Sequence, residues 1–130
     1  MTRILEERIA VVTGGGQGLG QAISLRLAKE GCHVVVADIN EAQAKETAAL
    51  IESETDRRST GMKVDVTNED EVAEMIDQTV STFGRLDLLV VNAGILIAGE
   101  TDQFPADKWR AVIDVNLNGY FLSAKHAAES

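Results

Sequence analysis

Apolar residues gather in four short runs along the chain, each rich in valine, isoleucine or leucine. The runs lie at 8–13, 33–38, 62–66 and 86–92. Continuous apolar runs of this length, bounded by glycine and polar residues, are typical of strands in a sheet that is covered on both faces. The run at 62–66 is shorter and alternates with polar residues at its start, so we expect it nearer the sheet edge.

Between and after these runs, apolar residues recur at the spacing of a helix with one buried face. Asn40 and either Thr67 or Asn68 are suitable N-caps, and Gly31 and Gly84 stand where left-handed caps would end two of the helices. The pattern therefore predicts four helices. Their apolar stripes are Leu19, Ala22, Ile23 and Leu27; Ala44, Ala48 and Ile51; Val72, Ile76, Val80 and Phe83; and Trp109, Ile113, Leu117, Tyr120, Phe121 and Ala124.

Strands that alternate with helices predict a parallel sheet with right-handed crossovers, an α/β fold of the Rossmann-like, doubly wound kind. The polar segment 52–60 is expected to be a loop, and residues 1–130 are expected to form one domain. In such folds ligands bind at the carboxyl ends of the strands, so the residues that follow each strand are the candidate site.

Composition excludes several classes of partner. The chain has 130 residues, 45% hydrophobic and 25% charged, with a net charge of -9 and no basic stripe, so we expect no nucleic-acid partner. No apolar stretch approaches the roughly 18 residues that span a bilayer, so we expect no membrane partner. The single cysteine, Cys32, cannot form an internal disulfide and fits a reducing, cytoplasmic location. No metal site is predicted.

A glycine cluster follows the first predicted strand. Gly14, Gly18 and Gly20 fit the spacing Gly-x-x-x-Gly-x-Gly, whereas the common dinucleotide fingerprint would need glycine at the position of Leu19. A triphosphate-binding loop is excluded, because the required Lys and Ser or Thr are replaced by Gln21-Ala22. The cluster predicts a pyrophosphate site at a helix N-terminus, and a glycine-rich turn without a ligand is the alternative.

Asp38 ends the second predicted strand, where a carboxylate can accept hydrogen bonds from adenosine ribose hydroxyls. The extra 2′-phosphate of NADP would face this carboxylate, and Ile39-Asn40 supplies no basic residue to offset the repulsion. Asp38 therefore predicts NAD rather than NADP. The alternative is that it only caps the following helix.

Three further positions are candidates at later strand ends. Asp65 and Val66 can receive an adenine, unless Asp65 is only a solvated turn residue. Asn92-Ala93-Gly94 is small enough for close approach by a ribose or ring, although a simple turn would use the same residues. Asn116 lies beside a buried helix stripe and needs a hydrogen-bond partner, which is also consistent with a structural role.

Taken in this order, the motifs resemble the classical short-chain dehydrogenase/reductase family over nearly the whole chain. The resemblance implies an NAD cofactor and an alcohol or ketone as the small-molecule substrate. It also implies a set of cofactor-binding residues. They are Gly14, Gln17, Gly18 and Leu19 at the pyrophosphate, Asp38 at the adenosine ribose, Asp65 and Val66 at the adenine, and Asn92, Ala93 and Gly94 at the inner portion of the cofactor, with Gly16 and Ile39 added to the set.

The chain departs from that family in its acid–base residues. The family's catalytic Ser and its Tyr-x-x-x-Lys pair have no counterpart before position 130, since Tyr120 and Lys125 are five apart rather than four. We expect Tyr120 to be core and Lys125 solvated. Of the catalytic residues, the resemblance implies only Asn116, holding a proton-relay water. The sheet is thus expected to be truncated after the fourth strand and its helix, and the chain alone to be inactive.

A narrower resemblance suggests a substrate. Residues 83–90 and 114–122 look similar to bacterial sorbitol-6-phosphate 2-dehydrogenases, with acetoin reductases and 3-oxoacyl-carrier reductases as alternatives. A non-catalytic dinucleotide-binding module and a methyltransferase-like Rossmann domain are the other function classes.

The free edge of the fourth strand and the apolar face of the last helix predict self-association, as a homo-oligomer.

Overall fold

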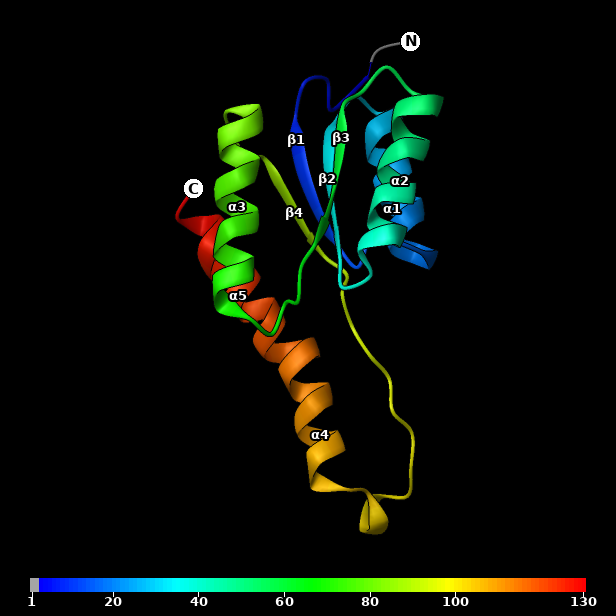
Figure 1. Ribbon diagram of the computed structural model, residues 1–130, viewed down its shortest axis with the longest axis vertical. Helices are drawn as coiled ribbons and strands as arrows, with labels where there is room; N and C mark the ends of the chain where they lie inside the picture. The colour runs from blue at the N-terminus through cyan, green and yellow to red at the C-terminus, as the bar shows by residue number, and fades with distance from the viewer. Residues whose placement is uncertain (1–2) are drawn as a thin grey trace.

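A computed structural model describes residues 3–130 of the chain, and it shows strands and helices in alternation (Figure 1). The four strands form one parallel sheet in the order β3-β2-β1-β4. The fold prediction is confirmed. The elements are β1 (Ile9–Thr13), α1 (Gly18–Lys29), β2 (His33–Asp38), α2 (Glu41–Glu54), β3 (Ser59–Lys63), α3 (Glu69–Phe83), β4 (Leu88–Val91), the short helix η1 (Thr101–Gln103), α4 (Ala106–Ile113), the π-helical segment η2 (Asp114–Asn118) and α5 (Gly119–Ala128).

Helices cover both faces of the sheet, with α1 and α2 on one face and α3 and α5 on the other (Figure 1). Alternate residues of β1 serve the two layers, since Ala10 and Val12 pack with Ala44 and Ile51 of α2, while Val11 packs with helix α3. The central strands are buried on both sides because their continuous apolar runs leave no polar face. This arrangement is doubly wound.

The predicted helix caps are present. Asn40 Oδ1 accepts the N–H of Gln43 at 3.0 Å, and Asn68 Oδ1 accepts the N–H of Glu71 at 3.2 Å, so Asn68 rather than Thr67 caps α3. Gly84 ends α3 in the left-handed conformation. Each cap satisfies an end group that the helix itself leaves unpaired.

The third strand lies earlier than predicted. It spans 59–63 rather than 62–66, so part of the predicted loop 52–60 belongs to the sheet, and α2 occupies another part. Two features fix this register: the strand pairs with β2, and α2 packs closely on it at Gly61. A Cβ on Gly61 would lie 2.6 Å from the backbone of α2, so only glycine fits there. Val64 is buried but extends past the ladder, so β-propensity misplaced the strand.

The last predicted helix is three consecutive helical segments, α4, η2 and α5, of which α4 runs past the carboxyl end of the sheet while α5 lies beside α3 (Figure 1). Gly119 and Ser123 take the inward positions, where a Cβ on Gly119 would lie 2.8 Å from Val66 Cγ2. Tyr120 therefore faces outward at 56% exposure, and its prediction as a core residue is wrong. Within residues 3–130, no helix is long and apolar enough to span a membrane.

Candidate functional site

A cavity of about 540 Å³ opens where the carboxyl ends of the strands meet. Parallel strands bring their following residues to one edge of the sheet, which is why positions far apart in sequence converge here. The residues that line it are Gly14, Gln17, Gly18, Asp38, Ile39, Val64, Asp65, Val66, Asn92, Ala93, Gly94, Ile95 and Val115. Of the predicted site residues, Gly16, Leu19 and Asn116 do not line the cavity.

Glycine is required in the loop after β1 by conformation and by space. Gly14 and Gly18 have φ values of 64° and 55°, in the left-handed region that favours glycine. A Cβ on Gly14 would lie 2.9 Å from the backbone of Ala93, and one on Gly20 would overlap the carbonyl oxygen of Gly14. The loop is thereby held against the β4 end, and α1 begins at Gly18 with its N-terminus at the cavity, an arrangement that favours an anion.

A buried threonine ties the loop after β1 to the loop after β4. Thr13 Oγ1 accepts the N–H groups of Asn92 at 3.1 Å and Ala93 at 3.2 Å, and Asn92 Nδ2 donates to the Gly14 carbonyl at 2.9 Å. Asn92 thus bonds to neighbouring main chain, as predicted. The role of Thr13 was missed, although a threonine that ends an otherwise apolar strand is a signal for it.

Asp38 is fixed by two main-chain donors before any ligand binds. Its Oδ2 accepts the N–H of Gly16 and its Oδ1 accepts the N–H of Asn40, each at 2.9 Å. The helix cap is Asn40, so the alternative of Asp38 as the cap of α2 is wrong. Gly16 lies behind Asp38, where a Cβ would come 2.8 Å from Oδ2, and Ile39 is exposed at the rim.

Asp65 lies in a small turn of its own. Its Oδ1 accepts the hydroxyl of Thr67 at 2.7 Å and the N–H of Thr67 at 2.9 Å. These hydrogen bonds hold the pKa of Asp65 below its ordinary value, because they favour the charged carboxylate. Val66 is buried beside it.

Asn116 has its side chain engaged by the loop after β4. Its Oδ1 accepts the N–H of Ile95 and its Nδ2 donates to the carbonyl of the same residue, both at 2.9 Å. Asn116 lies in the π-helical segment η2, a kind of helix that is frequent at functional sites. The geometry supports the structural interpretation, and the implied catalytic role stays a prediction. Lys125 is far from this arrangement, paired with Glu69 Oε1 at 2.8 Å.

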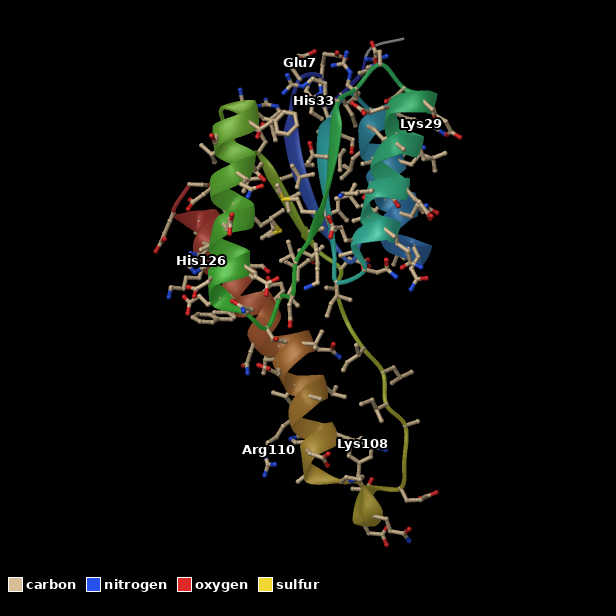
Figure 2. All side chains as sticks on the ribbon, in the orientation of Figure 1. Glu7, Lys29, His33, Lys108, Arg110 and His126 are labelled. Carbon is tan, nitrogen blue, oxygen red and sulfur yellow. The ribbon has the colours of Figure 1, made fainter. Side chains whose placement is uncertain are left out.

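A second charged cluster lies at the opposite end of the sheet, around Glu7 and His33 (Figure 2). Arg57 contacts Glu7 at 2.6 Å and Asp56 at 3.0 Å, and His33 Nε2 lies 3.1 Å from Glu7. Hydrogen bonds from Arg57 and then Arg3 lower the pKa of Asp56 to about 2. These carboxylates are all paired with cations of the same chain, so the cluster fastens the N-terminal segment to the loop before β3.

The cavity offers acceptors at Asp38 and Asp65, main-chain donors at the start of α1, and apolar surface from Ile39, Val66 and Ile95. This combination suits a ligand that has phosphates, hydroxyls and flat rings. Among residues 3–130, no group of three His, Cys, Asp or Glu side chains could hold a metal ion. The residues that line the cavity include no histidine, tyrosine or lysine.

Comparison with known proteins agrees with this geometry. The short chain dehydrogenase family model matches residues 8–130. An uncharacterized oxidoreductase of Thermotoga maritima is 38% identical over 126 residues, which are 97% of this chain and 49% of the relative. The cis-4-hydroxycyclohexanecarboxylate dehydrogenase of Sinomonas cyclohexanicum is also 38% identical, over 128 residues, with 98% and 51% covered.

Solved structures give the same result. A putative short-chain alcohol dehydrogenase from Sinorhizobium meliloti superposes with a TM-score of 0.92 at 33% identity, covering 99% of this chain and 51% of that one. A short-chain type dehydrogenase/reductase from Mycobacterium marinum gives 0.93 at 30% identity, with 98% and 50% covered. The chain spans about half the length of the relatives it matches.

Proposed function

Since the chain belongs to the short chain dehydrogenase family, we propose that it forms the NAD-binding part of an oxidoreductase. The observation that carries this proposal is the carboxylate of Asp38, which is fixed at the cavity by two N–H donors. A nicotinamide dinucleotide would place its pyrophosphate at the start of α1 and its adenosine ribose at Asp38. Asp65 and Val66 would then meet the adenine.

Charge supports NAD over NADP. The lining described above includes no lysine or arginine, whereas it holds the two carboxylates of Asp38 and Asp65. The 2′-phosphate of NADP would be brought against Asp38 without a cation to compensate, and like charges at short distance in a partly enclosed site repel strongly. The ribose hydroxyls of NAD would instead donate to the same carboxylate.

The reaction we propose is hydride transfer between the cofactor and a secondary alcohol or its ketone. Residues 1–130 offer no Ser and Tyr-x-x-x-Lys set for proton transfer, so we assign that step to residues outside this range. One similar protein is named for a hydroxycyclohexane carboxylate, whose hydroxyl is a secondary alcohol. Asn116 would act through the backbone of Ile95, to which its side chain is bonded.

For the substrate itself we propose sorbitol 6-phosphate, on the resemblance of residues 83–90 and 114–122, although none of the relatives named above carries that name. The whole protein, incubated with NAD and sorbitol 6-phosphate, is expected to produce NADH, followed by its absorbance. Sorbitol without the phosphate is the control. Turnover of cis-4-hydroxycyclohexanecarboxylate but not of the sugar phosphate would contradict the substrate and retain the reaction class.

The cofactor proposal is tested by titrating NADH and NADPH into the whole protein in a calorimeter. We expect NADH to bind at least about tenfold more tightly, the effect of one uncompensated charge contact of about 1.4 kcal/mol. Asp38→Asn should bring the two affinities close together. Glu41→Gln is the matched control, because Glu41 is an exposed carboxylate near the same end of α2 that does not line the cavity.

Either of two results would count against the proposal. Equal or tighter binding of NADPH by the unmodified protein would show that Asp38 does not select the cofactor. Binding of neither nucleotide, with tight binding of a methyl donor, would show that the cavity holds a different ligand from the proposed cofactor.

A further inference from the structure

Gln43 lies outside the glycine motif, at capping-box spacing from Asn40, yet its side chain contacts the proposed nucleotide site. It is in the first turn of α2, where its main-chain N–H donates to Asn40 Oδ1 at 3.0 Å. A Cβ on Gly16 would lie 2.8 Å from Gln43 Cβ and 2.8 Å from Asp38 Oδ2. Gly16 therefore lies close to both Gln43 and Asp38, with no room for a side chain.

The side chain of Gln43 reaches one residue further along the glycine loop. Its Nε2 donates to Gln17 Oε1 at 3.3 Å, and Gln17 lines the cavity. A glutamine amide carries its acceptor oxygen and its two N–H donors on the two arms of one planar group, so they point in different directions. Because the oxygen of Gln17 is used by Gln43, its N–H groups are the part left for a ligand, and none of residues 3–130 accepts a hydrogen bond from them.

We propose that Gln43 is a positioning residue for the dinucleotide: it turns the Gln17 amide so that Gln17 offers donors, not an acceptor, to the phosphate and ribose oxygens. This inference rests on the proposed NAD site. The side chain of Asp38 supplies only acceptors there, so Gln17 complements it with side-chain N–H groups in a lining that has no lysine or arginine. Without Gln43, the Gln17 amide is free to turn its oxygen toward the phosphates, which would weaken binding.

A second glutamine side chain forms a hydrogen bond between α1 and α2. It provides a control that distinguishes an effect on the Gln17 amide from a general loss of helix packing. Gln21 Nε2 donates to Thr47 Oγ1 at 3.2 Å, one turn farther along α1 and α2. Neither Gln21 nor Thr47 lines the cavity. Gln21→Leu therefore removes an interhelix hydrogen bond of the same kind without reaching the ligand, and serves as the matched control.

The experiment measures NADH dissociation constants for the whole protein by calorimetry. Gln43→Glu places an acceptor-only group opposite Gln17, so the Gln17 amide must turn its N–H groups away from the cofactor, and we expect about tenfold weaker binding. Gln43→Leu removes the contact without enforcing the reversed orientation, and we expect about threefold. Gln21→Leu should stay within about twofold of the unmodified protein.

Gln43→Glu also adds a negative charge, so its effect on NADH binding is measured a second time in a protein that lacks the Gln17 side chain. In a Gln17→Ala protein, Gln43→Glu should change the NADH dissociation constant less than about twofold, because the group through which Gln43 acts is gone. Circular dichroism melts identify a variant that fails to fold, in which case Gln43→Leu carries the test.

The outcomes distinguish the inference from the function on which it rests. If the unmodified protein binds neither NADH nor NADPH, both fail. If it binds NADH and Gln43→Glu binds equally well, or if the loss persists in the Gln17→Ala background, or if Gln21→Leu weakens binding as much, only the role of Gln43 is overturned.

Discussion

Buried hydroxyl groups on the helices differ in whether they find an acceptor. Ser24 Oγ donates to the Gly20 carbonyl and Thr79 Oγ1 to the Met75 carbonyl, both at 2.8 Å. Ser123 Oγ is equally buried but has no partner among residues 3–130. A buried hydroxyl without a partner lowers stability, because its hydration is lost without replacement.

We therefore expect Ser123→Ala to raise the free energy of unfolding by about 1 kcal/mol, since it removes an unpaired hydroxyl and improves helix propensity. Ser24→Ala is the matched control and should lower it by about 1 kcal/mol, because the hydroxyl it removes is bonded. Urea midpoints of the whole protein measure both. Destabilisation by Ser123→Ala would mean that a part of the protein outside residues 3–130 accepts its hydrogen bond.

Individual residues of the site could be predicted from the rule that ligands bind at the carboxyl ends of parallel strands. Asp38 ends a parallel strand, Asp65 and Asn92 follow one, and such ends converge whatever the intervening sequence. Thr13 also ends a strand, which is a signal for its role, but the residues to which it bonds depend on how two loops are folded against each other. Gln43 could not be found in this way, because its contact depends on how α2 packs against the glycine loop. The sequence contains no periodicity that reports such contacts.

Among the elements, those with long and regular patterns were predicted well, and β3 was not. Val64 and Val66 suggested a strand that includes them, whereas the ladder uses Ser59 to Lys63. A valine can be buried without being in the sheet, and here both are covered after the strand has ended. Gly61 marks the true strand through its close approach to α2, a constraint visible only in three dimensions.

The π-helical segment between α4 and α5 was also outside the reach of sequence patterns. An apolar stripe with helical spacing continues through it from Trp109 to Phe121, so periodicity predicts one uninterrupted helix. In the structure, Asn116 lies in this segment and pairs with the backbone of Ile95. The hint in the sequence was a polar residue beside an apolar stripe, which correctly predicted a partner without identifying it. The expected burial of that stripe was wrong, because Trp109 and Leu117 are exposed.

At the scale of the whole molecule, large apolar side chains are exposed along the last helical segments. Trp109 of α4, Leu117 of η2 and Phe121 of α5 are 59–60% exposed, on consecutive helical segments of which α4 extends beyond the sheet (Figure 1). Large exposed apolar side chains in one helical stripe are a frequent sign of an interface. A projecting helix can pair with its own copy about a two-fold axis, which places the same residues on both sides of the contact.

We therefore expect the whole protein to be a dimer or larger oligomer through this stripe, and Trp109→Glu to weaken it. Each large apolar side chain contributes about 1.5–3 kcal/mol when buried, and symmetry counts it twice, so the dimer dissociation constant should rise at least about 100-fold. Ile4→Glu is the control, because Ile4 is 78% exposed on the N-terminal segment, outside this stripe. Sedimentation of the whole protein at several concentrations measures this dissociation constant. An unchanged oligomer for Trp109→Glu would contradict the prediction and would mean that another part of the same protein covers the stripe.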